Sequence, residues 1–195
     1  MGLFAALVRT ARRRSPWIFH ANSGSCNGCD IELLACLTPR FDVEQLGVRN
    51  EGSPRHADIL VVSGPVTRNT CEALETVYAQ MPDPKVVLAL GSCPATGNVF
   101  AGSPAVVGPL HRVLPVDLYV PGCPPRPDAI VAAVAEAAAI LAGDRPRPAE
   151  PEAVPPGTVP PEAGQPGTGQ PGTGRPGTGN PEAGRHGDIT TGAPR

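Results

Sequence analysis

Six cysteines are the residues of this 195-residue chain best suited to do chemistry, and four of them stand in short, turn-like motifs. Cys26 and Cys29 form a C-x-x-C pair within the sequence SCNGCDIELL. Cys93 lies in GSCP and Cys123 in PGCPPRP, each directly before a proline. A C-x-x-C pair alone is compatible with zinc binding, dithiol redox chemistry or an iron–sulfur cluster.

The spacing of the four cysteines favours a cluster. A structural zinc site usually contains two close cysteine pairs, whereas Cys93 and Cys123 are single and far apart. A thioredoxin-like dithiol would need only Cys26 and Cys29, which leaves the other two unexplained. Four thiolates match the Cys₄ shell of a [4Fe–4S] cluster. One such cluster is the favoured interpretation, with zinc and dithiol chemistry as the open alternatives.

The remaining cysteines and the histidines have simpler interpretations. Cys36 lies within an apolar helical stretch and Cys71 near the start of another, so we expect buried or half-buried thiols. The histidines have no ligand-like spacing, and we expect them on the surface or in loops: His20, His56, His111 and His186.

Two carboxylates follow the C-x-x-C pair. Asp30 and Glu32 begin an apolar helix that is expected to reach about Leu37. Acidic side chains in a first turn suit the helix dipole, which is a sufficient reason for both. A second hypothesis gives Glu32 a role in moving protons in step with electrons.

Strand and helix signals alternate along the middle of the chain. We expect strands at 41–48, 57–62, 85–90 and 116–120, and helices at 69–80 and 127–141. This alternation predicts an α/β, flavodoxin-like fold with a mainly parallel sheet flanked by helices. Sites in such sheets form beyond the carboxyl ends of the strands. Cys93 and Cys123 should therefore share one rim, over which the Cys26–Cys29 loop could close.

Composition divides the chain into three segments. Residues 1–15 form a basic segment, either a docking helix or a frayed terminus, and residues 16–144 form the cysteine-bearing α/β domain. Residues 145–195 are rich in Pro and Gly, lack aromatic residues and repeat the unit PGTG. Such a sequence buries too little apolar surface to order its backbone, so we expect a disordered tail.

Charge and hydropathy narrow the partners and the location. The net charge of −2 argues against a nucleic-acid binder. No apolar stretch approaches the ~20 residues of a membrane span, and the basic and apolar parts of the N-terminus are in the wrong order for a secretory signal. We expect a cytoplasmic protein.

The three cysteine motifs together resemble a known family. They resemble the small subunit of membrane-bound, energy-converting [NiFe] hydrogenases, including the formate hydrogenlyase type, and are similar to the B subunit of NADH-quinone oxidoreductase, respiratory complex I. The resemblance covers about residues 16–142. The quinone enzyme typically has adjacent cysteines in CCAIE, so CNGCDIE favours the hydrogenase-related branch.

The resemblance implies one [4Fe–4S] cluster with Cys26, Cys29, Cys93 and Cys123 as ligands. It implies a non-catalytic electron-relay subunit that works with a hydrogenase large subunit or a complex I 49-kDa-type subunit, and with other iron–sulfur and membrane subunits. The complex would lie peripherally on the inner face of the cell membrane. Glu32 matches the glutamate of the family motif.

Two alternatives stay open beside the hydrogenase-like relay. The chain could be the B subunit of a quinone-reducing NADH dehydrogenase, or a metal-stabilised module without a redox role.

Overall fold

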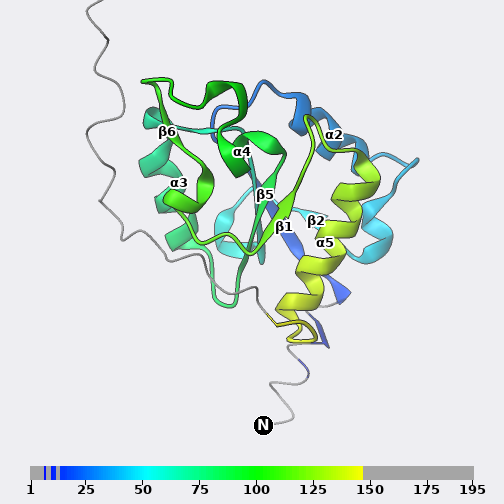
Figure 1. Ribbon diagram of the computed structural model, residues 1–195. Helices are drawn as coiled ribbons and strands as arrows, with labels where there is room; N and C mark the ends of the chain where they lie inside the picture. Colours follow the sequence, from blue (N-terminus) through cyan, green and yellow to red (C-terminus); the bar gives the residue numbers. More distant parts are fainter. Residues whose placement is uncertain (1–6, 8–9, 12–13, 147–195) are drawn as a thin grey trace, which may run out of the picture. The chain divides into compact units, whose positions relative to one another are not determined.

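The computed structural model describes residue 7, residues 10–11 and residues 14–146 (Figure 1). The tail predicted for 145–195 lies outside the described residues beyond residue 146, and so does much of the predicted basic segment at 1–15.

A five-stranded parallel sheet forms the centre of the described domain. The strand order is β2-β1-β3-β5-β7, which is the flavodoxin-like order 2-1-3-4-5 when only these strands are counted. The strands are β1 (Trp17–Asn22), β2 (Arg49–Asn50), β3 (Ile59–Ser63), β5 (Val86–Leu90) and β7 (Leu118–Val120). The expected mainly parallel α/β fold is confirmed.

Helices cover both faces of this sheet. On one face, α2 (Gly28–Cys36) and α5 (Pro127–Leu141) lie side by side (Figure 1) and share a core with the strands. On the other face, α3 (Arg68–Gln80) packs beside a short antiparallel pair of strands, β4 (Val66–Thr67) and β6 (Val106–Gly108).

The two central strands are buried on both faces, as their sequences require. Every residue of β3 (ILVVS) and β5 (VVLAL) is buried. Successive side chains point to opposite faces, so Val61 joins the core under α2 and α5 whereas Leu60 joins the core under α3. Near-continuous apolar runs are typical of such doubly covered parallel strands.

Short helices occupy the connections between the main elements. A five-residue helix, α4 (Ser92–Thr96), directly follows β5 and carries Cys93. Single turns of 3-10 helix occur at η1 (Val43–Leu46), η2 (Pro54–His56), η3 (Asn98–Phe100) and η4 (Leu110–Arg112). Within the part of the chain described, no helix is long and apolar enough to cross a membrane.

The strand expected at 41–48 is wrong. This segment forms the 3-10 turn η1, and only Arg49–Asn50 pairs with β1. Asp42 and Gly47, which flank the turn, both have left-handed φ values of 43° and 76°, so the backbone cannot stay extended. A Cβ on Gly47 would lie 1.7 Å from the Arg14 carbonyl oxygen.

The strand β1 was not expected from the sequence. It pairs with β3 in parallel over its whole length from Ile18 and with β2 on its other side, so it is an interior strand. Its residues Trp17–Asn22 include histidine and asparagine, which hid the strand signal. The buried Ile18 and the β-favouring aromatic residues on either side were the available clue.

Candidate metal centre

The four motif cysteines all lie beyond the carboxyl ends of strands. Cys26 precedes α2 and Cys29 occupies its first turn, so both follow β1. Cys93 lies in α4 after β5, and Cys123 lies three residues beyond the end of β7. Because the three strands are parallel, these ends meet at one edge of the sheet.

The thiols are near enough to one another to interact electrostatically. Burial, and then the charges of Cys93, Asp30, Cys26 and Cys123, raise the pKa of Cys29 to about 11. Burial also raises the pKa of Cys93, with Cys123 and Cys26 adding to the shift. Negative charge on the neighbouring sulfurs thus disfavours ionisation of Cys29 and Cys93, and a positively charged group bound among them would favour it.

The cysteines differ in exposure. Cys29 and Cys93 are buried, whereas Cys26 and Cys123 are exposed. In the described part of the chain, no three His, Cys, Asp or Glu side chains stand in an arrangement that would hold a metal ion as they are.

Backbone hydrogen bonds tie the β5 and β7 ends together. The Gly91 amide donates to the Val120 carbonyl at 2.8 Å, and the Ser92 amide donates to the Gly122 carbonyl at 2.8 Å. The Ser92 hydroxyl donates to the same Gly122 oxygen at 3.0 Å. The parallel pairing thus continues past the strands and sets the spacing of the loops that carry Cys93 and Cys123.

Gly91 is required by a close approach. Its φ of +94° is in the region that L side chains rarely adopt, and a Cβ there would lie 2.7 Å from the Cys29 sulfur. The absence of a side chain lets the Cys29 thiol sit directly against the β5–α4 turn. This contact joins the C-x-x-C motif to the GSCP motif.

A polar network fixes the Cys26–Cys29 loop. The Asp30 Oδ2 accepts hydrogen bonds from Asn22 Nδ2 at 2.8 Å and from the Ser25 hydroxyl at 2.5 Å. The Asp30 Oδ1 accepts from the Ser63 hydroxyl at 2.5 Å. The Asn22 Oδ1 in turn accepts the backbone amides of Gly24 and Ser25 at 2.9 and 2.8 Å. Side chains from β1, β3 and α2 therefore hold the loop.

His20 belongs to this network, and the expectation of a surface or loop histidine is wrong. It lies in β1, with Nε2 at 2.9 Å from both the Ser63 hydroxyl and Asp30 Oδ1. The one Ser63 proton goes to Asp30, so the His20 Nε2 must be the donor and carries the proton in the neutral ring. Burial lowers the pKa of His20, and the opposing effect of Asp30 does not overcome it.

Asp30 remains an ionised acceptor despite its surroundings. Burial acts to raise the pKa of Asp30, but hydrogen bonds from Ser25, Ser63 and Asn22, together with His20, lower it overall. Its side chain is only 14% exposed. The role expected from the sequence, a charge at the helix N-terminus, is therefore joined by a second one, which is to organise the loop.

Glu32 lies one turn after Cys29 on α2 and is half-buried. Its charge acts on Cys36, whose pKa is raised to about 11, mainly by burial and then by Glu32 and Asp128. The carboxylate that acts on Cys29 is Asp30. The sequence drew attention to Glu32, whereas the structure puts Asp30 in closest electrostatic contact with the thiols.

The two remaining cysteines are placed as expected. Cys36 is buried under α2 and its thiol donates to the Glu32 carbonyl at 3.2 Å and to the Pro127 carbonyl at 3.5 Å. Cys71 is half-buried in α3 and packs against the core on that side. Both thiols serve packing in this structure.

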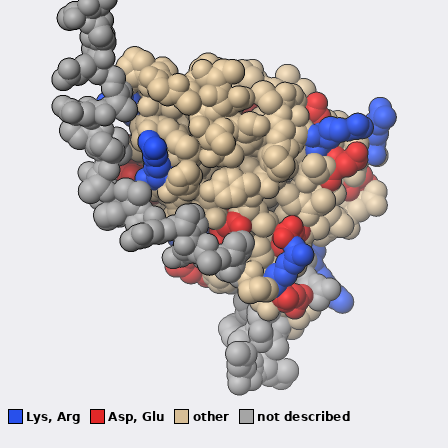
Figure 2. All heavy atoms as spheres, in the orientation of Figure 1, with Lys and Arg blue, Asp and Glu red and all other residues tan. Residues whose placement is uncertain are grey.

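The surface around the cysteine rim has few charges. Residues 86–110, from β5 through α4 to η4, contain no Lys, Arg, Asp or Glu. In Figure 2 the middle of the visible face, over α4, is correspondingly free of charged side chains, which lie toward its edges. Large apolar side chains are exposed in this segment and on α2: Val99, Phe100, Ile31 and Leu34.

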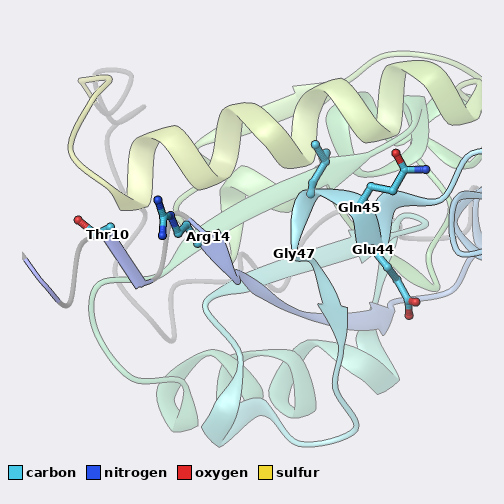
Figure 3. A pocket seen from close by; sticks show the side chains of 6 residues that line it. Thr10, Arg14, Glu44, Gln45 and Gly47 are labelled. Atoms are coloured by element: carbon cyan, nitrogen blue, oxygen red, sulfur yellow. The ribbon is translucent and has the colours of Figure 1, made fainter.

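A hollow lies apart from the cysteine rim, between the chain before β1 and the η1 turn (Figure 3). It is lined by Thr10, Arg14, Glu44, Gln45, Leu46 and Gly47. The oppositely charged side chains of Arg14 and Glu44 point in different directions in Figure 3. With no thiol or imidazole in its lining, this hollow offers little chemistry compared with the cysteine rim.

Comparison with known proteins identifies the family. The family model described as "NADH ubiquinone oxidoreductase, 20 Kd subunit" matches residues 26–137, a span that begins at Cys26 and includes all four motif cysteines. The chain belongs to this family. The family resemblance carried by the three cysteine motifs is confirmed.

Relatives within and near the family are subunits of larger enzymes. A probable membrane-bound hydrogenase subunit, mbhJ of Pyrococcus furiosus, is 58% identical over 137 residues, which cover 68% of this chain and 82% of that protein. The B subunit of NADH-quinone oxidoreductase from Heliobacterium modesticaldum is 43% identical over 127 residues, covering 65% of this chain and 71% of that protein.

A solved structure agrees with the sequence comparison. A chain of the membrane-bound sulfane sulfur reductase, an archaeal respiratory membrane complex, superposes with a TM-score of 0.63 at 34% identity. The match covers 71% of this chain and 76% of that one. This family member is therefore of a kind that works as one subunit of an oxidoreductase complex.

Proposed function

We propose that this chain carries one [4Fe–4S] cluster on Cys26, Cys29, Cys93 and Cys123 and relays electrons within a membrane-associated, hydrogenase-like oxidoreductase. The observation that carries the proposal is the meeting of four thiols from three strand ends, two of them buried, at one edge of the sheet. When bound, such a cluster supplies one-electron transfer.

The donor set fits this group better than a dithiol, and the wide separation of Cys93 and Cys123 argues against a zinc site built from two close cysteine pairs. All four side chains are thiols, the ligand type that iron–sulfur clusters require. The contact between Gly91 and the Cys29 sulfur joins motifs that are far apart in the sequence, which a two-cysteine redox site would not need.

In this proposal the residues of this chain hold the cluster and shield it from water, and the partner subunit does the bond-making chemistry. Four cysteine ligands leave no coordination position for a substrate, so turnover needs another subunit. The polar network around Asp30 fixes the first two cysteines, and the paired β5 and β7 ends fix the other two. Rigid ligands keep structural reorganisation small during electron transfer.

The charge-poor rim is the proposed docking face for a hydrogenase large-subunit-type or 49-kDa-type partner. Interface cores are depleted in charged residues and enriched in aromatic ones. The segment 86–110 lacks Lys, Arg, Asp and Glu, and it exposes Val99 and Phe100 a few residues beyond Cys93. A partner seated there would approach the cluster closely, and other subunits would attach the assembly to the inner face of the membrane.

This docking proposal can be tested by co-production. The chain produced alone is expected to aggregate or to lose its cluster in air, because the apolar rim is uncovered. Production together with the proposed large-subunit-type or 49-kDa-type partner should give a stable complex. A monodisperse monomer with an oxygen-stable cluster would contradict the proposal.

The hydrogenase-like branch is preferred over the quinone-reducing one. The membrane-bound hydrogenase relative shares 58% identity with this chain, compared with 43% for the quinone oxidoreductase relative. The spaced cysteines of CNGCDIE agree with that difference. The sequence of the partner subunit decides between the two branches, because nickel-binding cysteine pairs in it would support the hydrogenase-like branch.

Glu32 is proposed to couple electron transfer to proton uptake. It lies on α2 one turn after Cys29, on the helix whose exposed Ile31 and Leu34 border the docking face. A carboxylate there disfavours an added electron, and its protonation removes that effect. Glu32→Gln should keep the cluster and lose part of the pH dependence of its potential. Unchanged potential, pH dependence and turnover would leave Glu32 a structural residue.

Metal analysis after anaerobic reconstitution tests the central proposal. Four iron and four sulfide per chain are expected, whereas one zinc without sulfide would overturn it. Cys93→Ser should abolish the cluster, because a hydroxyl is a poor ligand for these metals. Cys36→Ser and Cys71→Ser are matched controls that should retain it, and loss of iron in either would show that the ligand set is wrong.

A further inference from the structure

Asn98 places one amide between two of the motif cysteines. Its Nδ2 lies 3.5 Å from the Cys123 sulfur and 3.8 Å from the Cys93 sulfur. These sulfurs follow different strands, β7 and β5, so a single side chain bridges the two loops. The family motif drew attention to the cysteines alone and gave no role to this residue.

The orientation of the amide follows from what the sulfurs can accept. An Asn amide has two N–H donors on one side and an oxygen acceptor on the other. Two thiolate sulfurs are acceptors, and the two N–H groups of Asn98 match them in number. The flipped amide would direct its oxygen at two negatively charged sulfurs, so Nδ2 is the end that faces Cys93 and Cys123.

The backbone holds Asn98 in place for this contact. Its φ of 48° is left-handed, a conformation that Asn tolerates better than most residues. The backbone amide of Asn98 donates to the Thr96 hydroxyl at 3.2 Å, and its backbone carbonyl accepts the backbone amide of Ala101 at 3.1 Å. The side chain therefore leaves the η3 turn in a fixed direction and is half-buried against the sulfurs.

We propose that Asn98 tunes the reduction potential of the bound cluster by donating hydrogen bonds to the sulfurs of Cys93 and Cys123. The inference rests on the proposed function, since it concerns the cluster these cysteines would hold. Reduction adds negative charge that spreads onto the ligand sulfurs. Donors aimed at those sulfurs stabilise the reduced form more than the oxidised form and raise the potential.

The position of Asn98 at the proposed docking face strengthens this effect in the complex. Its neighbours in η3, Val99 and Phe100, are 82% and 40% exposed. A partner covering them would exclude water from the amide. Hydrogen bonds are electrostatically stronger where the local dielectric constant is low. The tuning should therefore be measured in the assembled complex.

The test is the midpoint potential of the cluster in the purified complex of the full chain, followed by EPR during redox titration. Asn98→Gly removes the amide and accepts the left-handed backbone, so the fold is kept. Asn98→Asp keeps the size but replaces the two donors with a carboxylate. Gln80→Glu, at the exposed end of α3 opposite the rim, adds the same charge away from the cysteines as a control.

We expect full iron content in every variant and a potential that falls in the order wild type, Asn98→Gly, Asn98→Asp, with Gln80→Glu equal to wild type. Resonance Raman Fe–S bands should also shift less on transfer to D₂O in Asn98→Gly. A wild-type potential in Asn98→Gly, or loss of its iron, would overturn the tuning role. A wild-type complex without iron at these cysteines would instead overturn the proposed function.

Discussion

The two halves of the cysteine rim are held by different forces. The Cys26–Cys29 loop is fixed by side chains, through a network centred on Asp30. The loops of Cys93 and Cys123 are fixed by backbone, through hydrogen bonds that continue the β5–β7 pairing. The first half should therefore respond to changes of charge and pH, and the second to changes of size.

The difference follows from chain topology. Strands β5 and β7 are adjacent, so their ends can pair directly. The loop after β1 pairs by backbone as far as Ser23, whose amide donates to the Ser63 carbonyl at 2.9 Å, and then leads past Cys26 into α2. Polar side chains from the adjacent strands take over that task, because in the parallel register Asn22 stands opposite Ser63.

The largest effect is expected from Gly91→Ala, which tests the backbone-held half by size. The added Cβ would lie 2.7 Å from the Cys29 sulfur at a φ of +94°. Overpacking and a strained φ together should cost about 3 kcal/mol or more of unfolding free energy. Thermal unfolding and iron content should both fall sharply.

Gly52→Ala is the matched control for that change. A Cβ at Gly52 meets no atom within 4 Å. Its stability and iron content should stay near the wild-type values. Equal losses in the two variants would show that the contact between Gly91 and Cys29 does not organise the rim.

Asp30→Asn tests the network-held half by charge, with an expected loss of about 2 kcal/mol, within the range for a partly buried charged acceptor. An amide is nearly isosteric but has one acceptor oxygen and one NH₂ donor, so the hydrogen bonds that Ser25 and Ser63 donate to different oxygens of Asp30 cannot both persist. Iron should be released faster to a chelator. The Cys26–Cys29 side is expected to loosen first, which thiol alkylation at Cys26 would detect.

Asp128→Asn separates this effect from the helix dipole. Asp128 occupies the first turn of α5 as Asp30 does in α2, but it is exposed. A dipole contribution alone is worth a few tenths of a kcal/mol to about 1 kcal/mol. Similar losses in both variants would reduce Asp30 to a helix-terminal charge.

The contrast between the two halves also explains what could be predicted from sequence. Strands β3 and β5 are almost entirely apolar, and helix α5 is long and alanine-rich. In these elements the local sequence pattern and the observed burial agree. The alternation at 41–48 was misleading because left-handed residues at Asp42 and Gly47 close a turn there. Strand β1 was hidden because two of its six residues, His20 and Asn22, are polar members of the network.

The same reasoning applies to the candidate site. The cysteines were identifiable because each motif is local and carries its own turn residues. The network was not, because Asn22, Asp30 and Ser63 meet only through the register of β1 and β3. Asn98 likewise lacks a local signal, since its contact with Cys123 depends on the pairing of the β5 and β7 ends.

Acid should weaken the network-held half in two stages. Burial lowers the pKa of His20 below its usual 6.5, so the unfolded chain takes up this proton first as the pH falls. Stability is then complete above about pH 6.5 and is lost gradually below it. The lowered pKa of Asp30 adds a second loss that begins below its usual 3.8.

The first stage can be measured by amide hydrogen exchange of β1 between pH 7.5 and pH 5. Protection factors should fall by a few-fold in the wild type, and His20→Gln should remove that dependence. His56→Gln, at an exposed position, should behave as wild type. A wild-type profile that is flat over this range would show that His20 is not held in its neutral form by the fold.

The smallest effect is expected at the far end of α5, and it tests whether burial gives the Asp30 network its importance. Glu136 pairs with Arg145, but the side chains are 40% and 58% exposed, compared with 14% for Asp30. Water competes for an exposed pair and the two side chains lose entropy in forming it, so Glu136→Gln should change stability by no more than about 0.5 kcal/mol. Iron content and cluster potential should not move. If Glu136→Gln lowered the stability as much as Asp30→Asn, burial and the number of hydrogen-bond partners would not be what makes Asp30 important. The contrast between a polar half that organises the rim and a solvated surface would then fail.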